Sequence, residues 1–124
     1  MNIALCDDFE FFTELLKELI EEYKAEHNIT DILIQTFDSG EVLLSKITDN
    51  INYFDLIFLD QNMKKLTGSE TALQIRQLGG TCEIVFVSSE LAKYQFMCSK
   101  PLRILRKPPI KEDIYQILST VYGS

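Results

Sequence analysis

Acidic, hydroxyl and basic side chains follow four apolar stretches of this 124-residue sequence. Asp7 and Asp8 come after MNIALC, and Asp60 follows FDLIFL. Ser88 follows EIVFV, and Lys107 ends the stretch LRILRK. If these stretches are parallel strands of one sheet, their carboxyl ends meet at one edge. That edge then holds three carboxylates, a hydroxyl and an ammonium group, which suits the transfer of a phosphoryl group.

The clustered acids need a cation, because carboxylates about 4 Å apart repel by roughly 1 kcal/mol in water and about 4 kcal/mol at an effective dielectric constant of about 20. Mg²⁺ prefers oxygen ligands and is commonly held by one or two carboxylates together with a phosphate. We therefore predict that Asp7 and Asp8 bind Mg²⁺ beside Asp60, and that Asp60 is the nucleophile. Lys107 and Ser88 would contact the phosphoryl oxygens. Because no glycine-rich loop precedes a helix, a nucleotide held by this domain is not the expected donor.

Each of these residues also has a purely structural interpretation. An Asp or Ser at a strand end is often a turn or helix-cap residue, and a Lys before Pro is often only solvated. Cys6, beside the acid pair, is interpreted as a small buried hydrophobic residue. His27 is the only histidine and closes a predicted helix, so histidine-based catalysis has little support. The hypothesis of a site therefore depends on finding all of these polar residues at successive strand ends.

Short apolar runs alternate with amphipathic segments along the chain. Strands buried on both faces are apolar throughout, whereas helices repeat apolar residues every three to four positions. The alternation predicts an α/β protein, a flavodoxin-like three-layer sandwich with a parallel sheet in the order 2-1-3-4-5 and helices on both faces. The predicted strands are 2–6, 31–37, 54–60, 83–89 and 102–107; the predicted helices are 9–26, a short helix within 38–47, 69–78, 90–98 and 110–122.

The composition, with 46% hydrophobic and 25% charged residues, is typical of a globular protein. A net charge of −7 argues against nucleic acid as a direct partner. No apolar run reaches the roughly 20 residues that cross a membrane, and no signal peptide begins the sequence. The three cysteines have no metal-ligand spacing and cannot all pair. We therefore expect a cytoplasmic protein with no membrane partner.

The chain resembles a response-regulator receiver domain over essentially its whole length. The resemblance rests on the motifs ALCDD, DLIFLD, IVFVSS and LRKP, and on Gly68, eight residues after Asp60. The stretches VFVSS and KPLRILRKP are similar to the accessory gene regulator-like branch, whose receivers precede a LytTR-type DNA-binding domain. The family resemblance implies a phosphorelay switch that takes its phosphoryl group from a sensor histidine kinase, with Mg²⁺ as cofactor. The resemblance also implies that the protein is not a conventional enzyme and catalyses only its own phosphorylation and dephosphorylation.

The resemblance also implies a role for each matching residue. These are Asp7 and Asp8 (acidic metal pair), Asp60 (phosphoacceptor and metal ligand), Asn62 (metal ligand through its backbone carbonyl), Ser88 (switch hydroxyl) and Lys107 (the lysine of the family). Asn62 and Glu90 occupy the positions that border the path of the hydrolytic water and are expected to tune the lifetime of the phosphoryl group. Ile104 replaces the usual switch aromatic, a part that Tyr94 or Phe96 could take.

Residues 90–122 form the expected output surface, because they carry a basic cluster next to Ser88 and Lys107. Lys93, Arg103 and Lys111 are expected to pair with Glu112 and Asp113 of a second copy in a phosphorylation-dependent homodimer. In the same region, the Lys107–Pro108 peptide bond is predicted to be cis, since the chain must turn there while the ammonium group stays over the crevice.

The whole chain, 1–124, is interpreted as one receiver domain with no output domain, and we favour an excised receiver over a single-domain regulator. DNA would then be contacted only through the missing domain. One alternative is an interaction module of the same fold that takes no phosphate. Others are an aspartyl phosphatase and a flavodoxin-like electron carrier. Asn62 stands where the phosphatase would need a second Asp, and DDFEFF stands where the carrier would need a phosphate loop.

Overall fold

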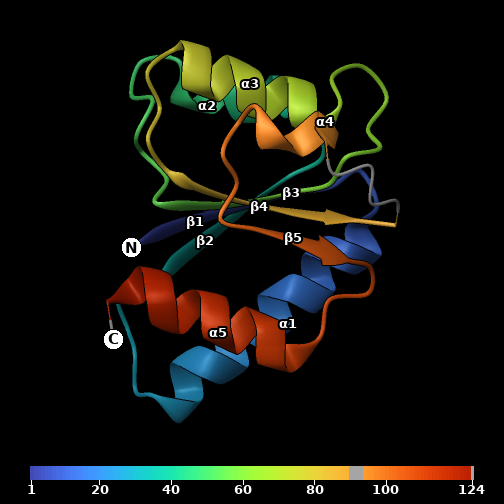
Figure 1. Cartoon of the computed structure of the whole chain (residues 1–124). Helices are drawn as coiled ribbons and strands as arrows, with labels where there is room; N and C mark the ends of the chain where they lie inside the picture. Colours follow the sequence, from blue (N-terminus) through green and yellow to red (C-terminus); the bar gives the residue numbers. More distant parts are fainter. Residues whose placement is uncertain (90–93, 124) are drawn as a thin grey trace.

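A computed structural model describes residues 1–89 and 94–123 of the chain. The strands are β1 (Asn2–Cys6), β2 (Leu33–Phe37), β3 (Leu56–Leu59), β4 (Glu83–Ser88) and β5 (Arg103–Arg106). The helices are α1 (Glu10–Glu26), α2 (Gly40–Ile47), α3 (Gly68–Gln77), α4 (Tyr94–Met97) and α5 (Lys111–Tyr122). All strand pairs are parallel, in the order β2-β1-β3-β4-β5. Helices α2, α3 and α4 cover one face of the sheet and α1 and α5 the other (Figure 1), which confirms the predicted three-layer sandwich.

Side chains of the central strands alternate between two hydrophobic cores. In β1, Ala4 and Cys6 belong to the core that faces α2, α3 and α4, whereas Ile3 and Leu5 belong to the core that faces α1 and α5. Strands β3 and β4 alternate in the same way, which explains why their sequences are apolar at nearly every position. The same alternation decides on which face each polar residue at a strand end is placed.

Local signals set the ends of the helices on the α2–α4 face. The Ser39 hydroxyl accepts a hydrogen bond from the Val42 N–H (3.2 Å) at the start of α2. Thr67 and Glu70 form a capping box at the start of α3, each side chain accepting from the other's backbone N–H. Helix α3 ends before Gly79, whose φ of +89° favours glycine and confirms the predicted stop.

The structure shortens several predicted elements. Strand β2 begins at Leu33 rather than 31, and β3 begins at Leu56 rather than 54. Asp55 precedes β3, and its side-chain carboxylate accepts the Asn2 N–H (2.8 Å). The regular pairing of β3 with β1 therefore begins at the next residue, Leu56. Helix α4 is described only over Tyr94–Met97, and positions 90–93 of the predicted helix lie outside the described residues. The predicted cis bond between Lys107 and Pro108 is confirmed.

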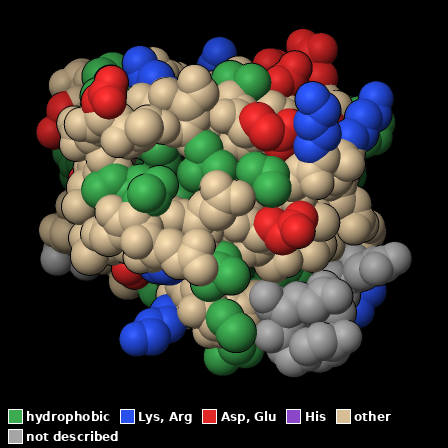
Figure 2. Space-filling view, turned by 90° about the horizontal axis from the view of Figure 1, so that it is seen from above, with side chains coloured by type: hydrophobic (Ala, Val, Ile, Leu, Met, Phe, Trp, Pro, Cys, Tyr) green, Lys and Arg blue, Asp and Glu red, His purple; other side chains and the backbone are tan. Residues whose placement is uncertain are grey.

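The face formed by α2, α3 and α4 exposes apolar side chains among charged ones (Figure 2). Leu73, Leu78 and Met97, from α3, the turn after it and α4, are 41%, 55% and 59% exposed. Among the described residues, no helix is both long and apolar enough to cross a membrane.

Candidate functional site

The sheet itself holds Asp60 beside the end of β1. The Asp60 N–H donates to the carbonyl of Cys6 (2.9 Å), and the Asp7 N–H donates to the carbonyl of Phe37 (3.0 Å). Strand β1 lies between β2 and β3, so the connections leaving β1 and β2 run to opposite sides. Crevices of open parallel sheets form at such a switch point, outside the carboxyl ends of the strands. Asp7 and Asp60 are therefore delivered to the place where a ligand site is expected.

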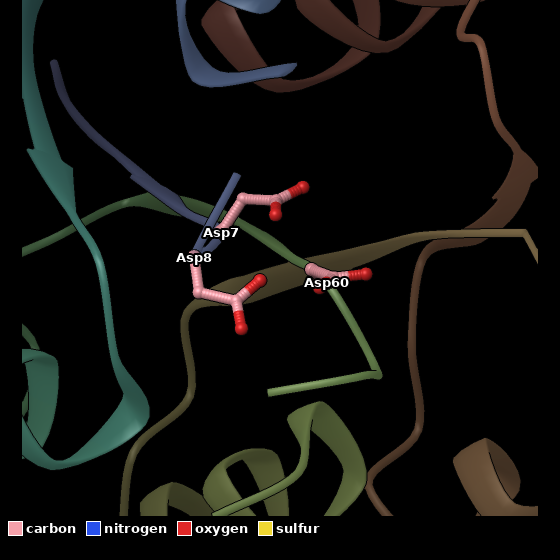
Figure 3. Close-up of side chains that lie close together, drawn as sticks. All are labelled: Asp7, Asp8 and Asp60. Carbon is pink, nitrogen blue, oxygen red and sulfur yellow. The ribbon is translucent and has the colours of Figure 1, made fainter. Parts of the chain in front are cut away.

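The three predicted acids lie together in this crevice (Figure 3). One carboxylate oxygen from each of Asp7, Asp8 and Asp60 lies within 4.8 Å of the other two. Asp7 and Asp60 are buried, with 5% and 4% of their surface exposed, whereas Asp8 is exposed to solvent. Oxygen donors that converge from two strand ends, one of them open to water, fit a hard divalent cation such as Mg²⁺.

Lys107 reaches the same crevice from the end of β5. Its Nζ lies 2.8 Å from Asp7 Oδ2 and 3.1 Å from Asp60 Oδ1, and only 11% of its side chain is exposed. The Lys107 N–H donates to the carbonyl of Ser88 (2.9 Å), which continues the pairing of β4 and β5 up to the crevice. Two buried carboxylates therefore share one ammonium group.

The surroundings of Asp60 disfavour the ionised form of its carboxyl group. Burial, followed by the charge on Asp7, raises the pKa of the Asp60 carboxyl from 3.8 to about 6. The ion pair with Lys107 and a hydrogen bond from the Asn62 backbone lower this pKa but do not offset the increase. A group that adds positive charge beside Asp60 would favour its ionised form.

The adjacent acids are tolerated for more reasons than the metal that the sequence analysis invoked. Asp8 is exposed to solvent, while Asp7 pairs with Lys107 and accepts the Phe9 N–H at 2.9 Å. Hydration and an internal cation therefore provide part of the compensation without a metal ion.

Ser88 and Ser89 lie at the end of β4 with different exposure. Ser88 continues the alternation of Ile84 and Phe86, on the face covered by α2, α3 and α4, and is fully buried (0% exposed). Ser89, the next residue, is exposed and borders a cleft of about 410 Å³. The residues that line this cleft are Asp8, Phe9, Phe12, Asp60, Asn62, Ser89, Lys107 and Pro108. The structure thus brings Ser89 to the border of the cleft, whereas the sequence analysis considered only Ser88 for contact with a phosphoryl group.

The remaining predicted residues differ in how they relate to the cleft. Asn62 is exposed and borders it together with Asp60. Ile104 is half-buried and packs against the core that faces α2, α3 and α4, away from the cleft. Glu90 and the side chain of Tyr94 lie outside the described residues.

Two residues that follow Asp60 support it in ways the sequence analysis missed. The Gln61 amide accepts the Ser69 N–H (2.7 Å) through Oε1 and donates to the Ser69 hydroxyl (3.0 Å) through Nε2. Gly68 lies so close to Asp60 that a Cβ atom there would collide with the Asp60 carbonyl oxygen. The start of α3 is thereby attached to the loop that carries Asp60. The available sequence signal was the spacing of Gly68 from Asp60.

Cys6 is confirmed as a buried structural residue. Its Sγ contacts Met63 Sδ (3.8 Å), and burial raises the pKa of its thiol to about 12, with a smaller contribution from the charge on Asp7. A thiol with this pKa stays protonated at neutral pH and does not act as a nucleophile or metal ligand.

Three of the charged residues expected to pair across a dimer, Arg103, Lys111 and Asp113, have partners within the chain. Arg103 Nη2 lies 3.0 Å from Asp113 Oδ1, and Lys111 Nζ lies 3.6 Å from Glu26 Oε1. The expected pairing of Arg103 and Lys111 with a second copy is therefore not needed to satisfy these charges. Lys93 lies outside the described residues.

The comparisons with known proteins agree with this fold. The sequence model of the response regulator receiver domain matches residues 3–118. The two-component response regulator ORR41 of rice (Oryza sativa subsp. japonica) is 33% identical to this chain over 58 residues. That match covers 47% of this chain and 46% of the rice protein, so it spans about half the length of this curated relative.

Solved structures show the same fold at lower identity. The response regulatory domain of Klebsiella pneumoniae mrkE has a TM-score of 0.83 and 23% identity, covering 98% of this chain and 95% of that one. A two-component response regulator from Clostridium difficile has a TM-score of 0.81 and 24% identity, with the same coverage. A chain of the CheX-CheY-BeF3-Mg+2 complex from Borrelia burgdorferi has a TM-score of 0.81 and 17% identity, and the match covers 100% of this chain and 90% of that one. With the family match over residues 3–118, the chain belongs to the response regulator receiver domain family.

Proposed function

We propose that this receiver domain is a phosphoacceptor switch in which Asp60 takes a phosphoryl group from a sensor histidine kinase with the help of Mg²⁺. The observation that carries the proposal is the meeting of three carboxylates, each with an oxygen within 4.8 Å of the others, beside the ammonium group of Lys107. Family membership supports a signalling switch rather than a conventional enzyme.

Asp7, Asp8, Asp60 and the backbone carbonyl of Asn62 would hold the metal ion. All of their donors are oxygen atoms, and Asp8 and Asn62 are exposed, which leaves room for the water ligands that Mg²⁺ retains. When bound, Mg²⁺ neutralises the acids and the incoming phosphoryl oxygens. Mg²⁺ is also present in the related Borrelia burgdorferi complex.

Asp60 performs the chemical step. One of its carboxylate oxygens forms a bond to phosphorus as the bond between phosphorus and the kinase imidazole nitrogen breaks, and that imidazole is left to take a proton. Lys107 is already 3.1 Å from Asp60 Oδ1, so its ammonium group is in place to pair with the phosphoryl oxygens. Burial of Asp60 keeps bulk water from the acyl phosphate, while the cleft of about 410 Å³ admits the donor.

Ser88 carries the conformational signal. It is buried on the face covered by α2, α3 and α4, and its hydroxyl would move to contact a phosphoryl group on Asp60. Ile104 packs on the same face and would follow this movement, with Tyr94 as the second candidate. The surface formed by residues 90–122 then changes its contacts, including those of a phosphorylation-dependent homodimer.

The output would be transcription, through a LytTR-type DNA-binding domain. The support is the similarity of VFVSS and KPLRILRKP to that branch of the family. Asn62, which borders the cleft, and Glu90 would orient the hydrolytic water and shorten the lifetime of the phosphoryl group. Replacing both residues with larger apolar ones should slow the decay of the phosphorylated mass after the donor is removed.

Intact-mass measurement with Mg²⁺ and acetyl phosphate tests the central proposal. The parent should gain one phosphoryl group, and Asp60→Asn or removal of Mg²⁺ with EDTA should abolish the gain. Asp55→Asn is a matched control, because Asp55 precedes the same strand at its opposite end. If Asp60→Asn gains the group as fast as the parent, Asp60 is not the acceptor. If the parent gains nothing, the domain is an interaction module instead.

A further inference from the structure

Lys107 has a third neighbour besides its two carboxylate partners. Its Nζ lies 4.1 Å from the centroid of the Phe12 ring, within the range of a cation–π interaction. Asp7 and Asp60 are the groups that a metal ion and a phosphoryl group would engage. The Phe12 ring would keep its contact with the ammonium group when both acids are occupied.

Neighbouring aromatic side chains hold the Phe12 ring in place. Phe12 is in the first turn of α1, and its N–H donates to the carbonyl of Phe9 (3.0 Å). Its ring makes edge-to-face contacts with Phe9 (5.5 Å, 82°) and with Phe11 (5.2 Å, 83°). Phe9 and Phe11 are 58% and 59% exposed, which hydrophobic packing alone does not explain. Support of the Phe12 ring gives both a reason to be aromatic.

The surroundings of Lys107 increase the effect of the ring. A cation–π contact is stronger when the cation is shielded from water, and the Lys107 side chain is only 11% exposed. Phe12 and Lys107 also border the same cleft as Asp60. The ring therefore acts on the ammonium group at the point where a phosphoryl group would arrive.

We propose that Phe12 is a positioning residue that keeps the Lys107 ammonium group over Asp60 after the two carboxylates have been taken up by metal and phosphoryl group. The inference rests on the proposed function of Asp60 and Lys107. It assigns to the face of an aromatic ring a task that a hydrophobic residue of similar size could not perform, because only the ring attracts a cation.

Replacing Phe12 with phenylalanine analogues that carry one, two or three ring fluorines tests this directly. Fluorination keeps the shape and apolar character of the ring but weakens its attraction for cations. The initial rate of phosphorylation by acetyl phosphate at saturating Mg²⁺ should fall with each fluorine at an unchanged melting temperature. We expect a loss of about 3- to 10-fold for the trifluorinated ring and for Phe12→Leu, and a rate close to that of the parent for Phe12→Tyr.

A second measurement needs no phosphorylation. Protons of the Lys107 ε-methylene group beside the ring should show an upfield ring-current shift in the NMR spectrum, retained on addition of Mg²⁺ and absent in Phe12→Leu. The trifluorinated analogue at Phe54, a core residue at the opposite end of the sheet, is the matched control and should leave rate and shift unchanged.

Equal rates across the fluorinated series would overturn the inference, as would the absence of the ring-current shift or its loss when Mg²⁺ is added. If the parent accepts no phosphoryl group, the proposed function fails, and the response of the ring-current shift to Mg²⁺ alone decides the role of Phe12.

Discussion

The crevice and the outer face of β5 and α5 both contain short ion pairs, but the pairs differ in their access to water. Lys107 lies 2.8 Å from Asp7 and 3.1 Å from Asp60, with side chains 11%, 5% and 4% exposed. Arg103 lies 3.0 Å from Asp113, with side chains 37% and 32% exposed. The distances are similar, so distance alone does not distinguish the two pairs. Burial does, because removing charges from water costs several kcal/mol for each ion.

The two regions also differ in charge balance. The outer pair has one cation for one anion, and Arg103 gains a further hydrogen bond to Gln116 (3.2 Å). In the crevice, Asp7 and Asp60 share the single ammonium group of Lys107. A buried site with more acid than base favours an added cation, whereas a balanced surface pair does not. The comparison therefore favours the crevice, rather than the outer pair, as the proposed metal site.

Removing Lys107 should have the largest effect on stability. In Lys107→Met, two buried carboxylates lose their counter-ion, and we expect a loss of about 3 kcal/mol in the free energy of unfolding without metal at neutral pH. Urea unfolding in EDTA measures it. Mg²⁺ should restore part of the loss, because it supplies the missing positive charge. Arg103→Met, the matched surface variant, should change stability by less than about 1 kcal/mol. Equal losses in the two variants would contradict the contrast between the regions.

Mg²⁺ should stabilise the parent by about 2.7 kcal/mol at a hundredfold excess over its dissociation constant. Asp60→Asn should be more stable than the parent without metal, since it relieves the repulsion from Asp7, and should respond less to Mg²⁺. Asp113→Asn, on the outer face, should keep the full response. Melting curves with and without Mg²⁺ give all three results. A parent indifferent to Mg²⁺ would remove the basis for a metal site in the crevice.

The pH dependence of stability should reveal the raised pKa of Asp60. Between the ordinary value of 3.8 and about 6, the folded state binds more protons at Asp60 than the unfolded state. Stability without metal therefore falls through this window as pH rises, by no more than about 3 kcal/mol from this group. The advantage of Asp60→Asn over the parent should grow by that amount from about pH 4 to pH 6.

Urea unfolding of both proteins in EDTA at several pH values measures this difference. In excess Mg²⁺ the trend in the parent should reverse, because the metal binds the deprotonated carboxylate. An advantage of Asp60→Asn that stays constant across the window in EDTA would show that burial does not raise the pKa of Asp60.

The outer ion pair should show the smallest effect. A double-mutant cycle with Arg103→Met and Asp113→Asn should give a coupling energy of about 0.2–1 kcal/mol, because both side chains remain partly hydrated. Salt at about 1 M should reduce it further by screening. A coupling energy above about 2 kcal/mol, or one insensitive to salt, would show that this pair is as strongly coupled as a buried ion pair.

The sequence by itself determined the sheet and, to within one residue, the positions where its strands end. Runs such as EIVFV are apolar at consecutive positions because both faces of a parallel sheet are covered, and that pattern is local. Asp7, Asp60 and Lys107 follow such runs, so their meeting at one edge could be predicted from chain order alone. Strand starts were less predictable, as the side-chain contact of Asp55 with Asn2 shows.

Only the tertiary structure decided which partners these residues have. Lys107 pairs with Asp7 as well as Asp60 and lies over the Phe12 ring, and each of these three residues is far from Lys107 in the sequence. Likewise, Arg76 Nε donates to the carbonyl of Ser99 (2.7 Å), from a segment that no local pattern connects to α3. Strand alternation places Ser88 in the core, while Ser89 borders the cleft. Such pairings depend on the face and depth at which each side chain is buried, and those follow from packing the whole chain rather than from spacing along it.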